Sequence, residues 1–110
     1  MTLSTTDTPV LDLLASMTAD SIEASSLDPE TLILVRIAAL AAVDAPAVSY
    51  LLNLGAASDI GVSADQVRGV LAAVAPIVGT ARIASATGKI AGALNVAIDI
   101  AEAEEEASGQ

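Results

Sequence analysis

Apolar residues recur at helical spacing along most of the chain, and the alternation typical of β-strands is nowhere sustained. This pattern predicts an all-α fold, a compact bundle of about five helices. Residues that cap or break helices separate the apolar segments. The helices are expected at about residues 10–23, 29–43, 46–58, 64–78 and 81–105.

Capping residues indicate where these helices begin and end. Asp28 is a good N-cap in front of a proline at the first helical position. Gly61 is placed to stop the third helix, and the segment Ser63–Gln66 supplies a capping box for the fourth. Pro76 is expected to kink or end the fourth helix, because an internal proline removes a backbone hydrogen bond.

Several apolar stripes are expected to face a core. They consist of Leu11, Leu14, Ala15 and Ile22 in the first helix, Val67, Val70, Leu71, Val74, Ile77 and Val78 in the fourth, and Ile83, Ile90, Leu94, Ala97 and Ala101 in the last.

Two helices carry features that favour contact between subunits. The second helix is apolar all round, with Arg36 the only charge between Thr31 and Val43, so it must be covered on every side. A small monomer covers such a helix with difficulty. In the last helix, Ala84, Gly88 and Gly92 belong to a strip with almost no side chains, which lets another helix approach closely. The pattern therefore predicts a homo-oligomer.

Composition excludes several kinds of chemistry. The 110 residues contain no cysteine and no histidine, which removes disulfides, thiolate redox chemistry, and metal sites built on thiolate or imidazole. We expect no cofactor and no metal. The formal net charge of −10 repels a phosphate backbone, so nucleic acid is not an expected partner.

The acidic charge is concentrated at the two ends of the chain, around a nearly neutral middle. We therefore expect a flexible acidic N-terminal segment at residues 1–9, a single helical domain at 10–105 and a flexible tail at 106–110. The longest uncharged stretch, Ala45 to Ser58, is shorter than the roughly 18–20 apolar residues that span a bilayer. With no basic region at the N-terminus, a cytoplasmic protein without membrane contact is expected.

Few side chains are candidates for chemistry, and no catalytic residue can be assigned. Arg36 lies in an otherwise apolar helix and needs a partner or a route to water. It is either an intersubunit ion pair or surface residue, or an anion-binding group in a pocket. Tyr50, the only aromatic residue, is either a packing residue or part of a binding site.

The order of segments from Asp28 to Leu94 resembles the carboxymuconolactone decarboxylase family, which includes alkylhydroperoxidase D. The resemblance rests on short segments in matching order and spacing. They are Asp28-Pro29, Arg36-Ile37-Ala38-Ala39-Leu40, Tyr50-Leu51-Leu52-Asn53-Leu54-Gly55-Ala56-Ala57, Gly61-Val62-Ser63, Val70-Leu71 and Ala75-Pro76-Ile77-Val78-Gly79.

The resemblance implies an alkylhydroperoxidase D-like fold whose subunits form trimers or hexamers with pockets at their interfaces. The peroxidase branch has Cys-x-x-Cys-x-x-x-His, and alignment on Gly61 places Pro46, Ser49 and Asn53 at those three positions. The decarboxylase branch keeps a histidine where this chain has Asn53. A surviving family pocket would be lined by Ser49, Tyr50 and Asn53, which share a helix face.

These observations favour a carboxymuconolactone decarboxylase-like protein without thiol redox activity, acting as an oligomeric small-ligand-binding or structural module. The alternative is a cofactor-free decarboxylase or lactone-handling enzyme acting on a small carboxylate. In that case Arg36 would hold the anion, and Tyr50 with Asn53 would polarise it. A peroxidase is the third possibility, by family membership only, because the chain has no thiol.

Overall fold

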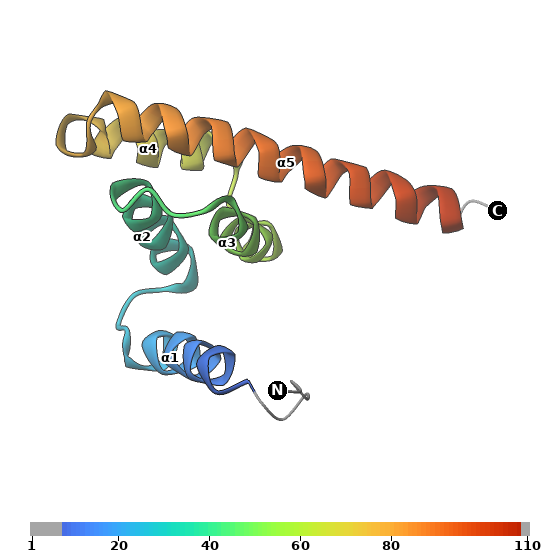
Figure 1. Cartoon of the computed structure of the whole chain (residues 1–110), viewed down its shortest axis with the longest axis horizontal. Helices are drawn as coiled ribbons and strands as arrows, with labels where there is room; N and C mark the ends of the chain where they lie inside the picture. The colour runs from blue at the N-terminus through green and yellow to red at the C-terminus, as the bar shows by residue number, and fades with distance from the viewer. Residues whose placement is uncertain (1–7, 109–110) are drawn as a thin grey trace, which may run out of the picture.

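The computed structural model describes residues 8–108, with side chains placed for 8–95, 103 and 106. Within this part the chain forms helices and no strand, which confirms the all-α prediction (Figure 1). The helices are α1 (Pro9–Ala24), α2 (Pro29–Ala42), α3 (Ala47–Ile60), α4 (Ala64–Val78) and α5 (Thr80–Ser108).

The expected capping residues begin and end the helices as predicted. The Thr31 backbone N–H donates to Asp28 Oδ1 (2.7 Å) at the start of α2. At the start of α4, the Gln66 backbone N–H donates to Ser63 Oγ (3.1 Å), and the Ser63 backbone N–H donates to Gln66 Oε1 (2.8 Å). Gly61 ends α3 at a φ of 95°, a left-handed conformation in which a side chain would be strained.

The end of α4 differs from the simplest expectation for an internal proline. Pro76 lies inside α4, and the helix continues to Val78 before Gly79, also at a φ of 95°, begins the turn. The last helix then extends to Ser108, so residues 106–108 of the expected tail belong to α5. Residues 1–7 of the expected N-terminal segment and residues 109–110 of the tail lie outside the described part.

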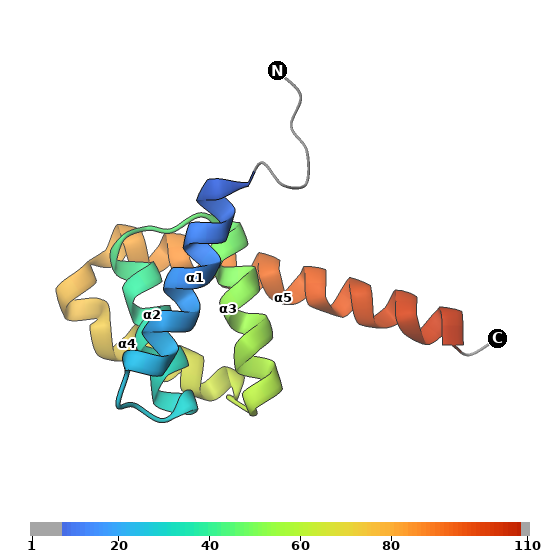
Figure 2. The same ribbon diagram turned by 90° about the horizontal axis from the view of Figure 1, so that it is seen from below.

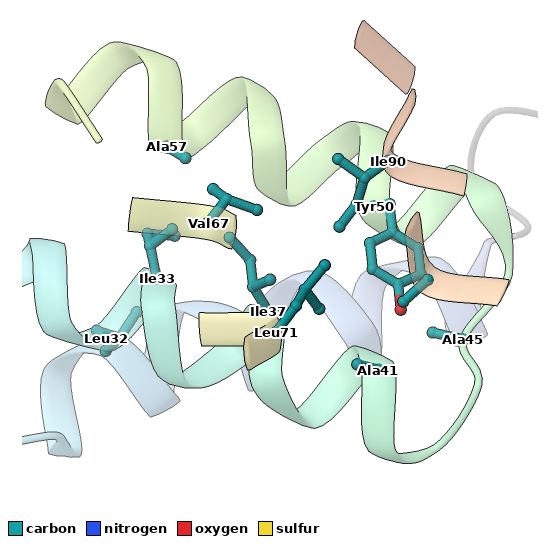
Figure 3. Packing of buried hydrophobic residues seen from close by; sticks show 11 residues of the cluster. Leu32, Ile33, Ile37, Ala41, Ala45, Tyr50, Ala57, Val67, Leu71 and Ile90 are labelled. Atoms are coloured by element: carbon teal, nitrogen blue, oxygen red, sulfur yellow. The ribbon is translucent and has the colours of Figure 1, made fainter. Parts of the chain in front are cut away.

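The core forms where α2 meets α3, α4 and α5 (Figure 3). Ile37 of α2 and Tyr50 of α3 are the largest side chains that are fully buried. Leu71 of α4 and Ile90 of α5 close the same cluster. Helix α2 supplies more buried residues than any other helix among the described side chains. These are Leu32, Ile33, Ile37 and Ala41.

The first helix lies outside this core, over α2 and α3 (Figures 1 and 2). No residue of α1 is buried. The prediction that Leu11, Leu14, Ala15 and Ile22 face a core is therefore wrong within one chain. The stretch before α2 places α1 over α2 and α3 without packing its apolar side chains into the core, so hydrophobic spacing alone does not bury them.

The predicted stripes on α4 and α5 are confirmed only in part. Val67 and Leu71 are buried, whereas Ile77 is 90% exposed. Ile77 lies off the row formed by residues 67, 71, 74 and 78, at the edge of the stripe. On α5, Ile90 is buried and Leu94 is half exposed, because beyond that point α5 projects away from the other helices (Figure 1). The side chains of Ala97 and Ala101 lie outside the described residues.

Candidate functional site

A cleft between α1, α2 and α3 brings two of the predicted binding residues together. It has a volume of about 440 Å³ and is called here the α1–α3 cleft. Arg36 reaches it from α2 and Asn53 from α3, and α1 contributes Thr18 and Ile22. The lining consists of Thr18, Ile22, Leu27, Pro29, Leu32, Ile33, Arg36, Leu52, Asn53, Ala56 and Ile60.

Arg36 is partly buried, and among the described residues it is the only charged side chain that lines this cleft. Its Nη2 donates to the hydroxyl oxygen of Ser21 on α1 (3.0 Å). Ion pairs among the described side chains join Arg68 to Asp65 and Lys89 to Asp44, so Arg36 has no carboxylate partner in that part of the chain. The guanidinium of Arg36 therefore contacts a neutral hydroxyl, in a position in which it could bind an anion instead.

Asn53 is held by its own helix. Its Nδ2 donates to the backbone carbonyl oxygen of Ser49, one turn earlier (2.8 Å). An amide side chain has a second N–H and a carbonyl oxygen, which remain for another partner. Ser49 thus acts through its backbone and positions Asn53, and it does not line the cleft itself.

Tyr50 lies in the core and not in the cleft. Its side chain is fully buried, and Figure 3 shows the hydroxyl turned toward Ala41 and Ala45. The hydroxyl has no hydrogen-bond partner among the described residues. Burial raises the pKa of this phenol, and the nearby carboxylate of Asp44 raises it further. The structure therefore places Arg36 and Asn53 in one site and separates both from Tyr50.

A polar cluster that sequence reasoning did not assemble joins the α2–α3 turn to α5. Asp44, at a φ of 52°, accepts hydrogen bonds from Ser85 Oγ (2.7 Å) and Lys89 Nζ (3.0 Å). These two contacts lower the pKa of the Asp44 carboxyl. Lys89 Nζ also donates to the carbonyl oxygen of Ala45 (2.8 Å), and Arg82 donates to that of Ala42.

This cluster satisfies carbonyl groups at the C-terminal end of α2 and ties α5 to the turn. Its cations already have partners, so it is a structural contact and not a binding site. Its members lie about forty residues apart in sequence, and no local motif connects them.

The strip of small residues on α5 is open. Ala84, Gly88 and Gly92 are all exposed, and a Cβ added at either glycine would meet nothing within 4 Å. Next to the strip is a shallow depression of about 370 Å³, which Gly88 and Gly92 help to line. Ala47, Val48 and Leu51 of α3 line the other side of this depression. Within the described part of the chain, the close helix contact predicted at this strip is not made.

A second apolar cleft, also absent from the sequence predictions, lies between α3, α4 and α5 and has a volume of about 460 Å³. Among the side chains that the structure places, its one charged lining residue is Arg68, which pairs with Asp65 on the same turn of α4. Both partners are exposed, so this ion pair is weak. Compared with the α1–α3 cleft, this one presents no unpaired charge among its lining residues.

No family model, curated protein or solved structure matches the chain. The resemblance to the carboxymuconolactone decarboxylase family consequently stays a prediction from the sequence. No group of three or more potential metal ligands occurs among the described residues. Within that same part, none of the helices is both long and apolar enough to cross a membrane.

Proposed function

We propose that the chain is a homo-oligomeric helical module that binds a small ligand in the α1–α3 cleft. The observation that carries the proposal is the exposure of α1. Large apolar side chains lie along this helix, and each is more than half exposed in the single chain. They are Val10, Leu11, Leu13, Leu14, Met17 and Ile22. An apolar helix in this situation marks a surface that another protein covers.

Exposed apolar residues at α2 support the same proposal. Val35 of α2 and Val43, which follows the last residue of that helix, are also more than half exposed. The sequence predicts that this helix is covered on every side. Assembly with further copies would cover these surfaces.

The resemblance in sequence favours a trimer or hexamer of a carboxymuconolactone decarboxylase-like protein. In such an assembly the strip at Ala84, Gly88 and Gly92 would face a helix of a neighbouring subunit. A second copy fits this role because only very small residues allow two helix backbones to approach closely.

Binding is favoured over catalysis by what lines the cleft. Arg36 can hold an anion and Asn53 can orient it, but neither transfers a proton near neutral pH. The alternative decarboxylase or lactone-handling activity requires Tyr50 to act with Asn53, and Tyr50 does not line the cleft. Peroxidase chemistry has no thiol to support it. We therefore propose a ligand-binding module without thiol redox activity.

The substitution Gly92→Leu tests the assembly, and Gly69→Leu of α4 provides a matched control. Both glycines are exposed and helical, and an added side chain has open space at each within the single chain. Leucine favours a helix more than glycine does, so neither variant should unfold. Native mass spectrometry should show an oligomer for the wild type and for Gly69→Leu, and smaller species for Gly92→Leu. A monomeric wild-type protein would contradict the proposal.

A further inference from the structure

The lining of the α1–α3 cleft has two chemically different parts. Eight of its eleven lining residues are apolar, from Ile22 on α1 to Ile60 on α3. The polar residues are Thr18, Arg36 and Asn53, and no aspartate or glutamate of the described part of the chain lines the cleft. A ligand that matches this surface has a large apolar part and a single anionic group.

Arg36 differs from the other three basic residues of the chain. Arg68 and Lys89 each contact a carboxylate, and Arg82 donates to a backbone carbonyl at the end of a helix. Among the described side chains, the hydrogen-bond partner of Arg36 is the neutral hydroxyl of Ser21. Its charge is therefore compensated the least, although it lies partly buried beside apolar residues.

A guanidinium group suits a carboxylate in particular. Its N–H groups form a planar fork that matches the two oxygens of a carboxylate, and such charge-assisted hydrogen bonds are stronger than neutral ones. Only one nitrogen of Arg36, Nη2, is bonded to Ser21, so other N–H groups of the fork remain for a ligand. The amide of Asn53 adds one further donor to the same cleft.

The single cation also limits the number of carboxylates. A second carboxylate would have to lie against the apolar residues without a charged partner, which is unfavourable. An aliphatic chain in the same place would gain from burial against Leu32, Ile33 and Leu52. The volume of about 440 Å³ falls within the range of roughly 300–1,000 Å³ that small-molecule sites occupy.

We propose that the α1–α3 cleft binds an amphipathic monocarboxylate, of the medium-chain fatty acid type, with its carboxylate on Arg36 and its aliphatic tail among the apolar residues. This inference rests on the proposed ligand-binding function and names the chemical class of the ligand. The second apolar cleft, between α3, α4 and α5, is not a site of this kind, because its arginine, Arg68, is already paired with Asp65.

Helix α1 forms one wall of the α1–α3 cleft and makes few other contacts with the rest of the chain. It supplies Thr18 and Ile22 to the lining and Ser21 to Arg36, but it buries no residue of its own. Within the single chain, α1 is therefore held at this site mainly by its lining residues and by the hydrogen bond from Arg36 to Ser21. An aliphatic tail in the cleft adds apolar contacts for Ile22 and should stabilise α1 against α2 and α3.

Isothermal titration calorimetry with decanoate, below its micelle concentration, tests this inference. The comparison ligands are 1-decanol, which has the tail without the charge, and glutarate, which has two carboxylates and a short chain. We expect decanoate to bind more tightly than either one. Arg36→Leu should weaken decanoate binding about tenfold or more, because a hydrogen-bonded charge pair is lost. Arg36→Lys keeps the charge without the planar fork, so its affinity for decanoate should lie between those of the wild type and Arg36→Leu.

Arg68→Leu serves as the matched control and should bind decanoate as the wild type does, since Arg68 is exposed and lies outside the α1–α3 cleft. Equal decanoate affinity for the wild type and Arg36→Leu would overturn the inference. So would tighter binding of glutarate than of decanoate, or no binding of decanoate at all. Should Arg36→Leu fail to fold, amide chemical shifts of the wild type with decanoate decide, because changes confined to residues outside α1, α2 and α3 would contradict the site.

Native mass spectrometry of the same samples separates this inference from the proposed function. An oligomer that fails to bind decanoate overturns the ligand class and leaves the proposed assembly standing. A monomer that binds decanoate through Arg36 contradicts the proposed assembly and supports the site.

Discussion

Helices α1 and α2 resemble each other in composition but lie in different environments. Each begins with a proline and is rich in large aliphatic residues, and they contain 16 and 14 residues. Helix α2 contacts three other helices and buries four of its residues, whereas α1 buries none. The comparison shows that aliphatic residues at helical spacing predict a helix, and that they do not determine whether the same chain buries its apolar face.

The two helices also begin differently in detail. At the start of α2 the Asp28 carboxylate accepts a hydrogen bond from the Thr31 backbone, which satisfies one free N–H group. At the start of α1 the Thr8 side chain makes no such bond and donates instead to Asp12 Oδ1 (3.2 Å). The start of α2 is therefore held in place by its own sequence, whereas the start of α1 has no side-chain cap.

The largest difference should appear when one aliphatic side chain of each helix is shortened. Ile37→Ala removes contacts from the centre of the core and should lower the free energy of unfolding by about 2–5 kcal/mol. Leu14→Ala, at an exposed site on α1, should lower it by less than about 0.5 kcal/mol in dilute protein. Urea unfolding measures both. A large loss for Leu14→Ala that does not depend on protein concentration would show that α1 packs on its own chain.

Removing the hydroxyl of Tyr50, which is buried beside α2, should change the free energy of unfolding by a smaller amount and in the opposite direction. Its hydroxyl has no partner among the described residues, so burying it is unfavourable. Tyr50→Phe removes that group without changing the ring and should raise the free energy of unfolding by about 1 kcal/mol. Decanoate binding should not change, because the residue is outside the cleft. A destabilised variant would show that the hydroxyl has a partner in solution.

The smallest expected change in stability comes from replacing the N-cap residue of each of the two helices. Asp28→Ala should lower the melting temperature by a few degrees at pH 7, whereas Thr8→Ala should leave it nearly unchanged. The hydrogen bond from Thr31 holds the pKa of the Asp28 carboxyl below its ordinary value of 3.8. The folded state thus favours the ionised form, and its contribution to stability is present above that value and is lost as the pH falls through the lower pKa.

Melting curves recorded from pH 7 down to pH 2 check this prediction. The difference between the wild type and Asp28→Ala should shrink below about pH 4, where the carboxyl group becomes protonated. A difference that stays constant over the whole range would show that the charge of Asp28 does not contribute to the cap.

The helix boundaries could be predicted because they depend on nearby residues. Asp28, Gly61 and the capping box at Ser63 act within one turn of the chain, and each does what its local sequence indicates. The contact of Asp44 with Lys89 could not be predicted, since it depends on how α5 lies over the α2–α3 turn. The same holds for the contact of Arg36 with Ser21, which joins two helices.

The candidate site was predictable only in part for a related reason. Asn53 and Tyr50 lie within one turn of α3, yet Asn53 lines the cleft and Tyr50 is in the core. Leucines surround both of them in sequence, so α3 has no single apolar face from which the orientation could be inferred. The packing of α2 and α5 against α3 decides the direction in which each of these side chains points.

The sequence by itself determined an all-helical chain, its helix ends, and the absence of thiol and imidazole chemistry, because these follow from residue types and from contacts within a turn. The tertiary structure alone decided which apolar faces are buried, that Arg36 and Asn53 share a cleft, and that α1 lies outside the core. Those outcomes depend on the directions in which rigid helices leave their connecting turns, and small local differences there move whole faces from the core to the surface.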